Sequence, residues 1–377
     1  LFIRTTWESL GAGGRLTILG AGSVLFFGTS ALAHKIWKLD RTGTAFYILG
    51  SAFLPISVWA AGYLELFGSS LSGASNPWLM MLSFAAFTII ALIAVRIYRK
   101  TVWGVLFLCG MTLSYFWLTR AVCKDFAYQA IALAVYALAL NLAARPLSER
   151  LPLPISTPLP LFSLVTAFIL LPGALIHPGE NVFFYGISGC LLAVSFLTPL
   201  SFRYLKGFAA IPVTCLSFGS VIQLLSPMTD NGIYSMRDIT IVTIAAVFCA
   251  VFTLLLSLHE ALPQRVQYGF RGAFYTVSVI GMIGLFEHTV SDHGYPWEIL
   301  ASNLILLGAT LLPTLRESKA MLRGYSAAEA CLLGMGAAVF LDSYVPSEQQ
   351  YLLYFLIPVL YLLFFGVFRA VRSLRSV

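Results

Sequence analysis

Charge is the property that this sequence has least of. Only 10% of its 377 residues are Asp, Glu, Lys or Arg, whereas 59% are hydrophobic. Soluble domains carry about 25% charged residues, so a water-soluble fold could not cover this much apolar surface. The scarcity of charge therefore predicts that a lipid bilayer surrounds much of the chain.

Short motifs of catalytic and binding sites are missing as well. The sequence has no CxxC pair, no HExxH, no GxSxG and no glycine-rich loop followed by Lys. Its six cysteines fall mostly within apolar segments, which favours small buried side chains over disulfides or metal ligands. We therefore expect no cofactor and no metal site.

Long apolar segments are what the sequence has instead. Backbone groups in the hydrocarbon must pair with one another, which leaves helices or a closed barrel. The segments are about 17–23 residues long without alternation, which excludes barrel strands of about 10 residues. We predict an all-α, polytopic transmembrane helical protein of about 13 spans. The predicted spans are 16–33, 44–67, 78–95, 102–119, 126–144, 158–176, 181–200, 207–226, 239–258, 270–287, 297–314, 325–341 and 350–369.

The cations predict an orientation. Eighteen of the 23 Lys and Arg residues lie either in alternate connections, beginning with the one after the first span, or in the C-terminal tail. Such asymmetry in short loops marks the cytoplasmic side, so we expect an integral plasma membrane protein, of the bacterial inner membrane, with a cytoplasmic C-terminus. The net charge of +7 does not indicate a nucleic-acid partner, because the cations lie in the short loops between the spans, where they set orientation.

The spans are spaced as pairs. A span, a basic turn and a returning span recur at intervals of about 55 residues, which predicts tandem parallel helical hairpins. We divide the chain into hairpins at 1–147, a Pro-rich cytoplasmic link at 148–157 and further hairpins at 158–377. The prolines from 146 to 160 predict that no helix continues through this stretch. Thirteen spans place Leu1 outside, so we also expect at least one earlier span.

Functional candidates gather at the predicted outer ends of the returning spans. These candidates for substrate binding are Glu65, Arg120, His177 and Asp342. If the hairpins surround a common axis, these four residues line one outward-facing vestibule together with Glu287 and His288. If the hairpins lie in a row, all of them are solvated helix ends. Glu287, His288, Asp292 and His293 form the densest cluster and are the candidates for a catalytic site, because His and carboxylates serve as acid and base.

Polar residues inside the spans are few. Glu329 is a further binding candidate, although Ser326 and Glu329 also match a capping box at a helix start. Four uncharged polar residues, Gln129, Asn141, Gln223 and Asn303, favour hydrogen bonds between helices. Two glycine pairs, Gly20 with Gly22 and Gly334 with Gly336, predict close helix contacts.

The first segment resembles a known group of proteins. It contains Trp7, Leu10, Arg15–Leu16, Leu19–Gly20, the basic stretch 35–41 and Leu49–Gly50. In these features residues 7–68 resemble a loose group of bacterial multi-pass membrane proteins of unknown function with repeated Arg-Leu and Gly-containing helix pairs. The resemblance implies a bacterial plasma membrane and, in many of its members, a soluble segment upstream.

Three functions fit these observations. The low polarity of the spans favours a structural or assembly subunit of a membrane complex, whose partners would be membrane lipids and other membrane proteins. The span count and the prolines within spans allow a transporter or a protein that handles lipids or lipid-linked substrates. The cluster around Glu287 allows a membrane enzyme acting at the outer face, although the sequence leans away from an enzyme.

Overall fold

In a computed structural model of the chain, the described residues are 11–63, 65, 76–175, 181–226, 236–290 and 297–314, with positions 359, 363, 366 and 367. All regular structure in these residues is helical. The chain divides into two compact units, Leu1–Leu170 and Leu171–Val377. The fold of the described residues is therefore all-α, as the sequence predicts.

Eight segments of the described chain are long and apolar enough to cross a bilayer. They are Asp40–Tyr63, Pro77–Tyr98, Thr101–Val122, Phe126–Arg150, Leu153–Leu175, Pro199–Leu225, Ile239–Leu258 and Gln264–Glu287, and two shorter apolar helices are Val182–Phe196 and Ala301–Thr310. The protein is a multi-pass membrane protein. The predicted spans 325–341 and 350–369 fall almost entirely outside the described residues, so the total of 13 stays a prediction.

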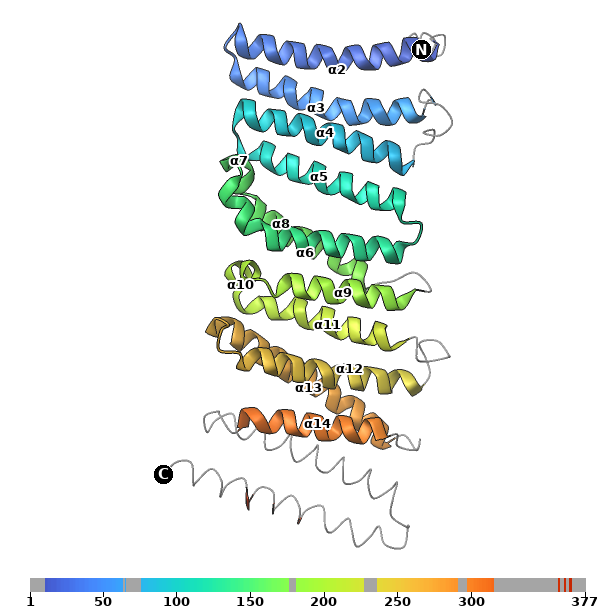
Figure 1. The fold of residues 1–377 in the computed structure, drawn as a ribbon, viewed down its shortest axis with the longest axis vertical. Helices are drawn as coiled ribbons and strands as arrows, with labels where there is room; N and C mark the ends of the chain where they lie inside the picture. The colour runs from blue at the N-terminus through green and yellow to red at the C-terminus, as the bar shows by residue number, and fades with distance from the viewer. Residues whose placement is uncertain are drawn as a thin grey trace. The chain divides into compact units, whose positions relative to one another are not determined.

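The first unit is built from long helices in sequence. These are α2 (Ala12–Lys35), α3 (Asp40–Tyr63), α4 (Pro77–Tyr98), α5 (Thr101–Val122), α6 (Phe126–Arg150), the short α7 (Leu153–Ser156) and most of α8 (Leu159–Leu175). Helix α2 packs on α3, α3 on α4 and α4 on α5. Figure 1 shows these four helices side by side in a single layer.

Local sequence signals explain where several helices begin. The Asn76 side chain accepts hydrogen bonds from the backbone N–H groups of Trp78 and Leu79, and Pro77 occupies the first turn of α4. Asp125 caps α6 in the same way. These caps satisfy N–H groups that have no partner within the helix.

The prediction that no helix continues through the Pro-rich stretch is wrong at its start. Helix α6 runs through Pro146 to Arg150. Pro146 removes one hydrogen bond, to the carbonyl four residues earlier. It lies only four residues from the helix end, beside the exposed and charged Arg145. Water can satisfy the released carbonyl there, so the helix tolerates the proline.

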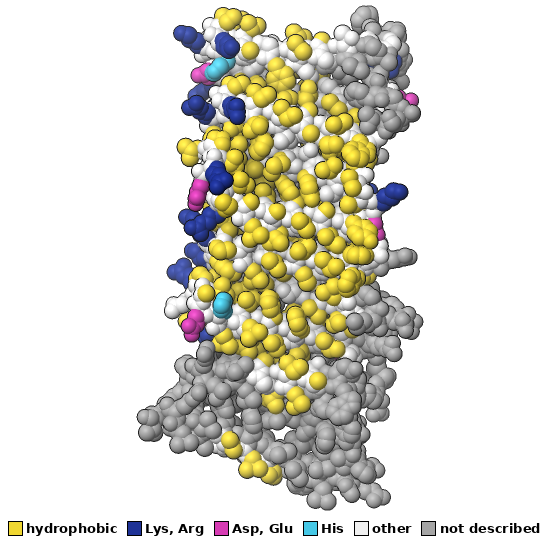
Figure 2. Space-filling model, in the orientation of Figure 1, with side chains coloured by type: hydrophobic (Ala, Val, Ile, Leu, Met, Phe, Trp, Pro, Cys, Tyr) yellow, Lys and Arg dark blue, Asp and Glu magenta, His cyan; other side chains and the backbone are white. Residues whose placement is uncertain are grey.

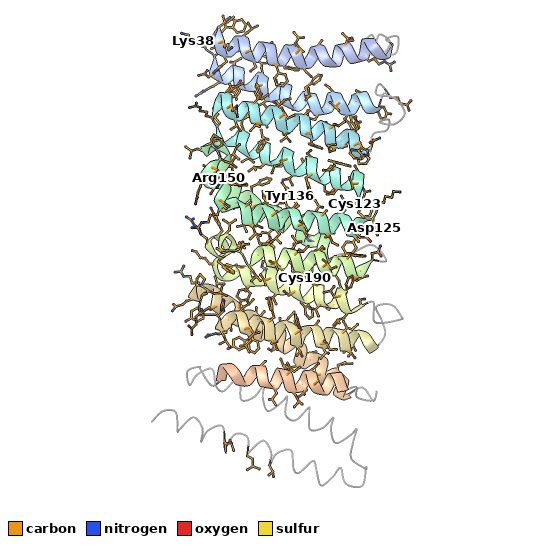
Figure 3. The ribbon with its side chains drawn as sticks, in the orientation of Figure 1. Lys38, Cys123, Asp125, Tyr136, Arg150 and Cys190 are labelled. Atoms are coloured by element: carbon orange, nitrogen blue, oxygen red, sulfur yellow. The ribbon has the colours of Figure 1, made fainter. Side chains whose placement is uncertain are left out.

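The cations of the first unit gather at one end of its helices. Figure 3 shows Lys38 and Arg150 at this end, and Cys123 and Asp125 at the other. We call the end that carries Lys38, Arg99 and Arg150 the basic end. The antiparallel path of consecutive helices produces this separation, because every second connection returns to the same end.

A buried apolar cluster of the second unit lies between three of its helices. Its elements are α9 (Val182–Phe196), α10 (Pro199–Leu205), the 3-10 helix η2 (Lys206–Ala209), α11 (Ala210–Leu225), α12 (Met236–Leu258), α13 (Gln264–Val290) and α14 (Trp297–Thr314). This cluster comes from α12, α13 and α14 and includes Leu254, Phe274, Leu285 and Leu306. Small polar side chains are buried on the same three helices, among them Thr253, Ser278 and Ser302.

The cysteines differ in part from the prediction. The five described cysteines are free thiols, and Cys249 alone among them is buried. Cys190 and Cys215 are exposed on α9 and α11. An apolar helix face that meets lipid has the same composition as a buried one, so hydropathy could not separate these environments.

Candidate functional site

Two of the predicted vestibule residues lie in the described part of the first unit. Glu65 is exposed just beyond α3 in the left-handed backbone region, and its N–H donates to the carbonyl of Gly62 at 3.1 Å. Arg120 lies in the last turn of α5, with its guanidinium carbon 4.1 Å from the centre of the Phe126 ring. No ion pair joins Glu65 to Arg120 in the described structure, and each has its own local contacts.

The other predicted site residues are described only in part. Glu287 is exposed in the last turn of α13, and His288 follows it in the same helix. Asp292, His293, His177, Glu329 and Asp342 lie outside the described residues. Within the described chain, no three His, Cys, Asp or Glu side chains are grouped so that they could hold a metal ion. The vestibule and the catalytic cluster remain predictions.

One predicted hydrogen bond between helices is confirmed. The buried Gln223 side chain of α11 donates through Nε2 to the carbonyl of Ala174 in α8 at 2.9 Å. Gln129, Asn141 and Asn303 are buried as well. The second unit thus uses an amide to join two helices in an apolar environment, which is the structural role that the sequence favours.

An aromatic cluster lies toward the basic end of α2–α5, at residues for which the sequence pattern predicts no site. Tyr47, Tyr98 and Trp103 contact one another with ring centres 5.1–6.0 Å apart. The hydroxyl groups of Ser30 and Tyr98 share a hydrogen bond of 3.0 Å, and Tyr47 donates to the carbonyl of Ile90 at 3.0 Å. Trp103 is only 2% exposed. The cluster joins all four helices and is a structural feature, because its rings are largely buried.

The short helix α7 packs on α5 next to this cluster. A Cβ atom at Gly104 in the first turn of α5 would lie 1.8 Å from the carbonyl oxygen of Pro154. Only glycine permits such a close approach between the two backbones. Ile155 is consequently 1% exposed. The Pro-rich stretch is therefore packed against α5 at this point.

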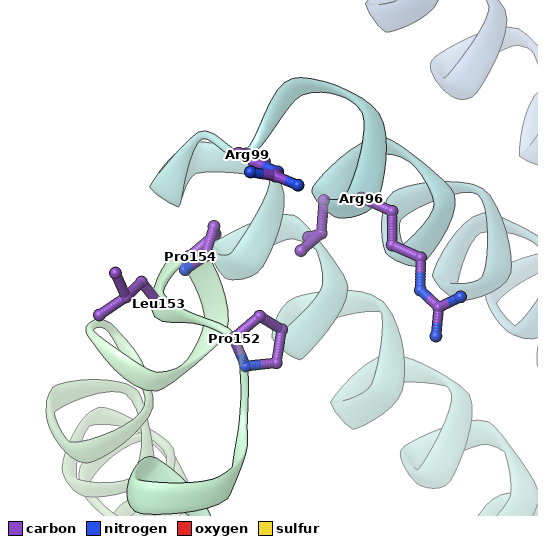
Figure 4. Close-up of a pocket in the computed structure, with 6 residues that line it drawn as sticks. Arg96, Arg99, Pro152, Leu153 and Pro154 are labelled. Atoms are coloured by element: carbon purple, nitrogen blue, oxygen red, sulfur yellow. The ribbon is translucent and has the colours of Figure 1, made fainter.

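A cavity of about 530 Å³ opens between α7 and the end of α4. Its lining residues are Val95, Arg96, Arg99, Pro152, Leu153 and Pro154. Figure 4 shows the segment from Pro152 to Pro154 facing the end of α4, with Arg99 over the opening and Arg96 extending away from the prolines. The cavity thus combines two cations with an apolar wall, and no acidic residue lines it.

The backbone of Arg99 is unusual. Its φ is 50°, in the left-handed region, where its N–H donates to the carbonyl of Val95 at 3.1 Å and ends α4. Glycine is the usual residue at this kind of helix end. Lys38 in the preceding basic turn has a φ of 53°. The sequence has a cation at each of these positions, but the presence of Lys and Arg in a turn does not predict a left-handed backbone.

Comparison with protein-family models, with characterised proteins and with solved structures found no match to this chain.

Proposed function

We propose that the protein is a structural or assembly subunit that packs against other membrane proteins. The observation that carries the proposal is the single layer formed by α2–α5. Only 22% of the apolar stretch of α5 is buried within the chain, and 28% of that of α4. Figure 2 shows the apolar side chains that cover one face of this layer. A layer one helix thick leaves surfaces on which a partner's helices can pack.

The buried residues also favour a scaffold function rather than ion-coupled transport. The buried polar side chains of the described chain are Ser, Thr, Asn and Gln, and none carries a charge. Coupling to ions or protons usually requires ionisable side chains within the spans. Uncoupled transport, handling of lipid-linked substrates and an outer-face enzyme site at Glu287 remain alternatives that these buried residues do not address.

Photo-crosslinking in intact membranes tests the scaffold function. A photoreactive amino acid replaces Ile89 or Ile93, which are exposed on α4, and the buried Ala91 provides the matched control. We expect a discrete adduct with another polypeptide from the exposed positions and only internal products from position 91. Lipid adducts alone from both exposed positions, with a chain that migrates as a monomer in mild detergent, would contradict the proposal.

The distribution of cations supports an orientation for this scaffold. We place the basic end of the first unit, and with it the C-terminus of the chain, in the cytoplasm of a bacterial cell. The support is the excess of Lys and Arg on alternate connections and the resemblance of residues 7–68. Orientation by this rule is independent of what the scaffold binds.

A further inference from the structure

We propose that the cavity between α4 and α7 binds the phosphate group of an anionic organophosphate, with Arg99 and Arg96 as its ligands. The site goes beyond the scaffold function and does not depend on it. Arginine matches phosphate because its planar guanidinium can donate two parallel hydrogen bonds to two oxygens. Both arginines line the cavity, and no acidic residue in the lining competes for them. Arg99 is the principal ligand, because the Arg96 side chain extends away from the prolines and must turn to reach a phosphate (Figure 4).

The place of the cavity in the fold favours a ligand at the membrane surface. It lies at the ends of α4 and α6, both of which are long and apolar enough to span a bilayer. The headgroup region is therefore at the level of the two arginines. Basic pockets between helices at the cytoplasmic surface are a known way of holding lipid headgroups. A volume of about 530 Å³ is within the range of small-molecule sites.

The apolar wall adds a second requirement. Leu153 is 80% exposed although it lies beside two prolines in a helix that otherwise packs on α5. An inorganic ion gains nothing from this wall, whereas the glycerol and upper acyl carbons of a phospholipid, or the organic part of a phosphate ester, can cover it. The lining therefore fits a phosphate that is attached to an apolar or amphipathic group.

Topology alone does not explain Arg99. The adjacent Lys100 already supplies a cation to the same turn, and the left-handed backbone at position 99 is unfavourable for any residue with a Cβ. A glycine would relieve this strain and leave a cation in the turn. Three other described residues with a Cβ share this positive φ and do not line the cavity. What sets Arg99 apart is that its side chain lies over the cavity opening (Figure 4).

The same backbone conformation provides a matched control. Lys38 has nearly the same φ, lies in another basic turn of the first unit and does not line the cavity. The variants Arg99→Gly and Lys38→Gly each remove one cation and relieve the same kind of strain. Neither change should impair folding. A difference in ligand binding between them then reports on the cavity and not on net charge.

The experiment uses the full chain in nanodiscs of phosphatidylcholine with a minor fraction of phosphatidylglycerol. Native mass spectrometry measures the phosphatidylglycerol that stays bound. We expect Arg99→Gly to lower its retention at least tenfold, Arg96→Gln to lower it by less, and Arg99→Lys to restore part of it. Lys38→Gly should retain the lipid as the unchanged protein does, and the thermal midpoint of Arg99→Gly should not fall.

Soluble glycerol 3-phosphate and inorganic phosphate, added to the discs that contain phosphatidylglycerol, distinguish the sources of the ligand. Lipid retention that neither soluble compound displaces assigns the site to a phospholipid headgroup. Displacement by glycerol 3-phosphate, with binding that depends on Arg99, assigns it to a soluble ester. Equal losses in Arg99→Gly and Lys38→Gly would show attraction to the surface charge in general and would overturn the proposal, as would retention that neither variant changes.

Discussion

Replacing Gly104 by alanine tests how α7 is held. The new Cβ atom would lie 1.8 Å from the carbonyl oxygen of Pro154, and an ordinary contact begins at 3.4 Å, so the α7 backbone must retreat by about 1.6 Å. Forcing extra atoms into a packed contact costs about 1–3 kcal/mol. Because 1.4 kcal/mol corresponds to a factor of ten, the population in which α7 is detached should rise by about 5- to 150-fold.

The detachment can be measured at Ile155, which is 1% exposed when α7 is packed. In a background without the native cysteines, Ile155→Cys is labelled with a membrane-impermeant maleimide, with and without Gly104→Ala. We expect labelling to accelerate by the same factor as the detached population.

Gly20→Ala is the control, because a Cβ atom there meets nothing within 4 Å. Equal labelling rates in the Gly104→Ala and Gly20→Ala backgrounds would refute the proposed role of the close contact between α5 and α7.

Other substitutions test other parts of the structure. Gln223→Leu should destabilise the second unit by about 0.6–1.7 kcal/mol in a bilayer unfolding assay, because it removes the hydrogen bond to α8; an unchanged unfolding free energy would contradict this. Gly269→Ala should lower the thermal midpoint in detergent, since its Cβ would lie 2.1 Å from the carbonyl oxygen of Gly207, and a midpoint equal to that of the unchanged protein would disprove the contact. Single cysteines at Lys38 and Lys124 should be labelled from opposite sides of the membrane, and labelling of both from one side would exclude the predicted path.

The sequence predicted the helices better than it predicted their contacts. A span must be apolar along its whole length because the hydrocarbon supplies no hydrogen bonds, so hydropathy locates α4 and α5 within a few residues. Contacts depend on single atoms. The glycine pair at 20 and 22 shows this, because a Cβ at Gly22 would lie 2.8 Å from the Phe53 ring whereas Gly20 faces open space. The close contact predicted for Gly20 is therefore wrong, and that for Gly22 is confirmed.

The candidate site was missed for a similar reason. Orientation accounts for the cations of the turn that holds Arg96 and Arg99, and the predicted link between hairpins accounts for the Pro-rich stretch. Each assignment accounts for its residues separately, but neither predicts that α7 folds back onto α5. The signal that could have suggested it is Gly104 one turn into α5, followed later in the chain by a short segment between prolines. That signal is weak, because glycines in apolar helices are common.

The single layer of α2–α5 has a consequence for biosynthesis. Each of these helices has its main contacts with the helix made immediately before or after it. Such local pairing is rapid, since no segment waits for a partner that is far away in the chain. The helices can therefore associate in order as they leave the ribosome and enter the bilayer. In evolution, the same arrangement allows a pair of helices to be gained or lost while the remaining pairs keep their neighbours.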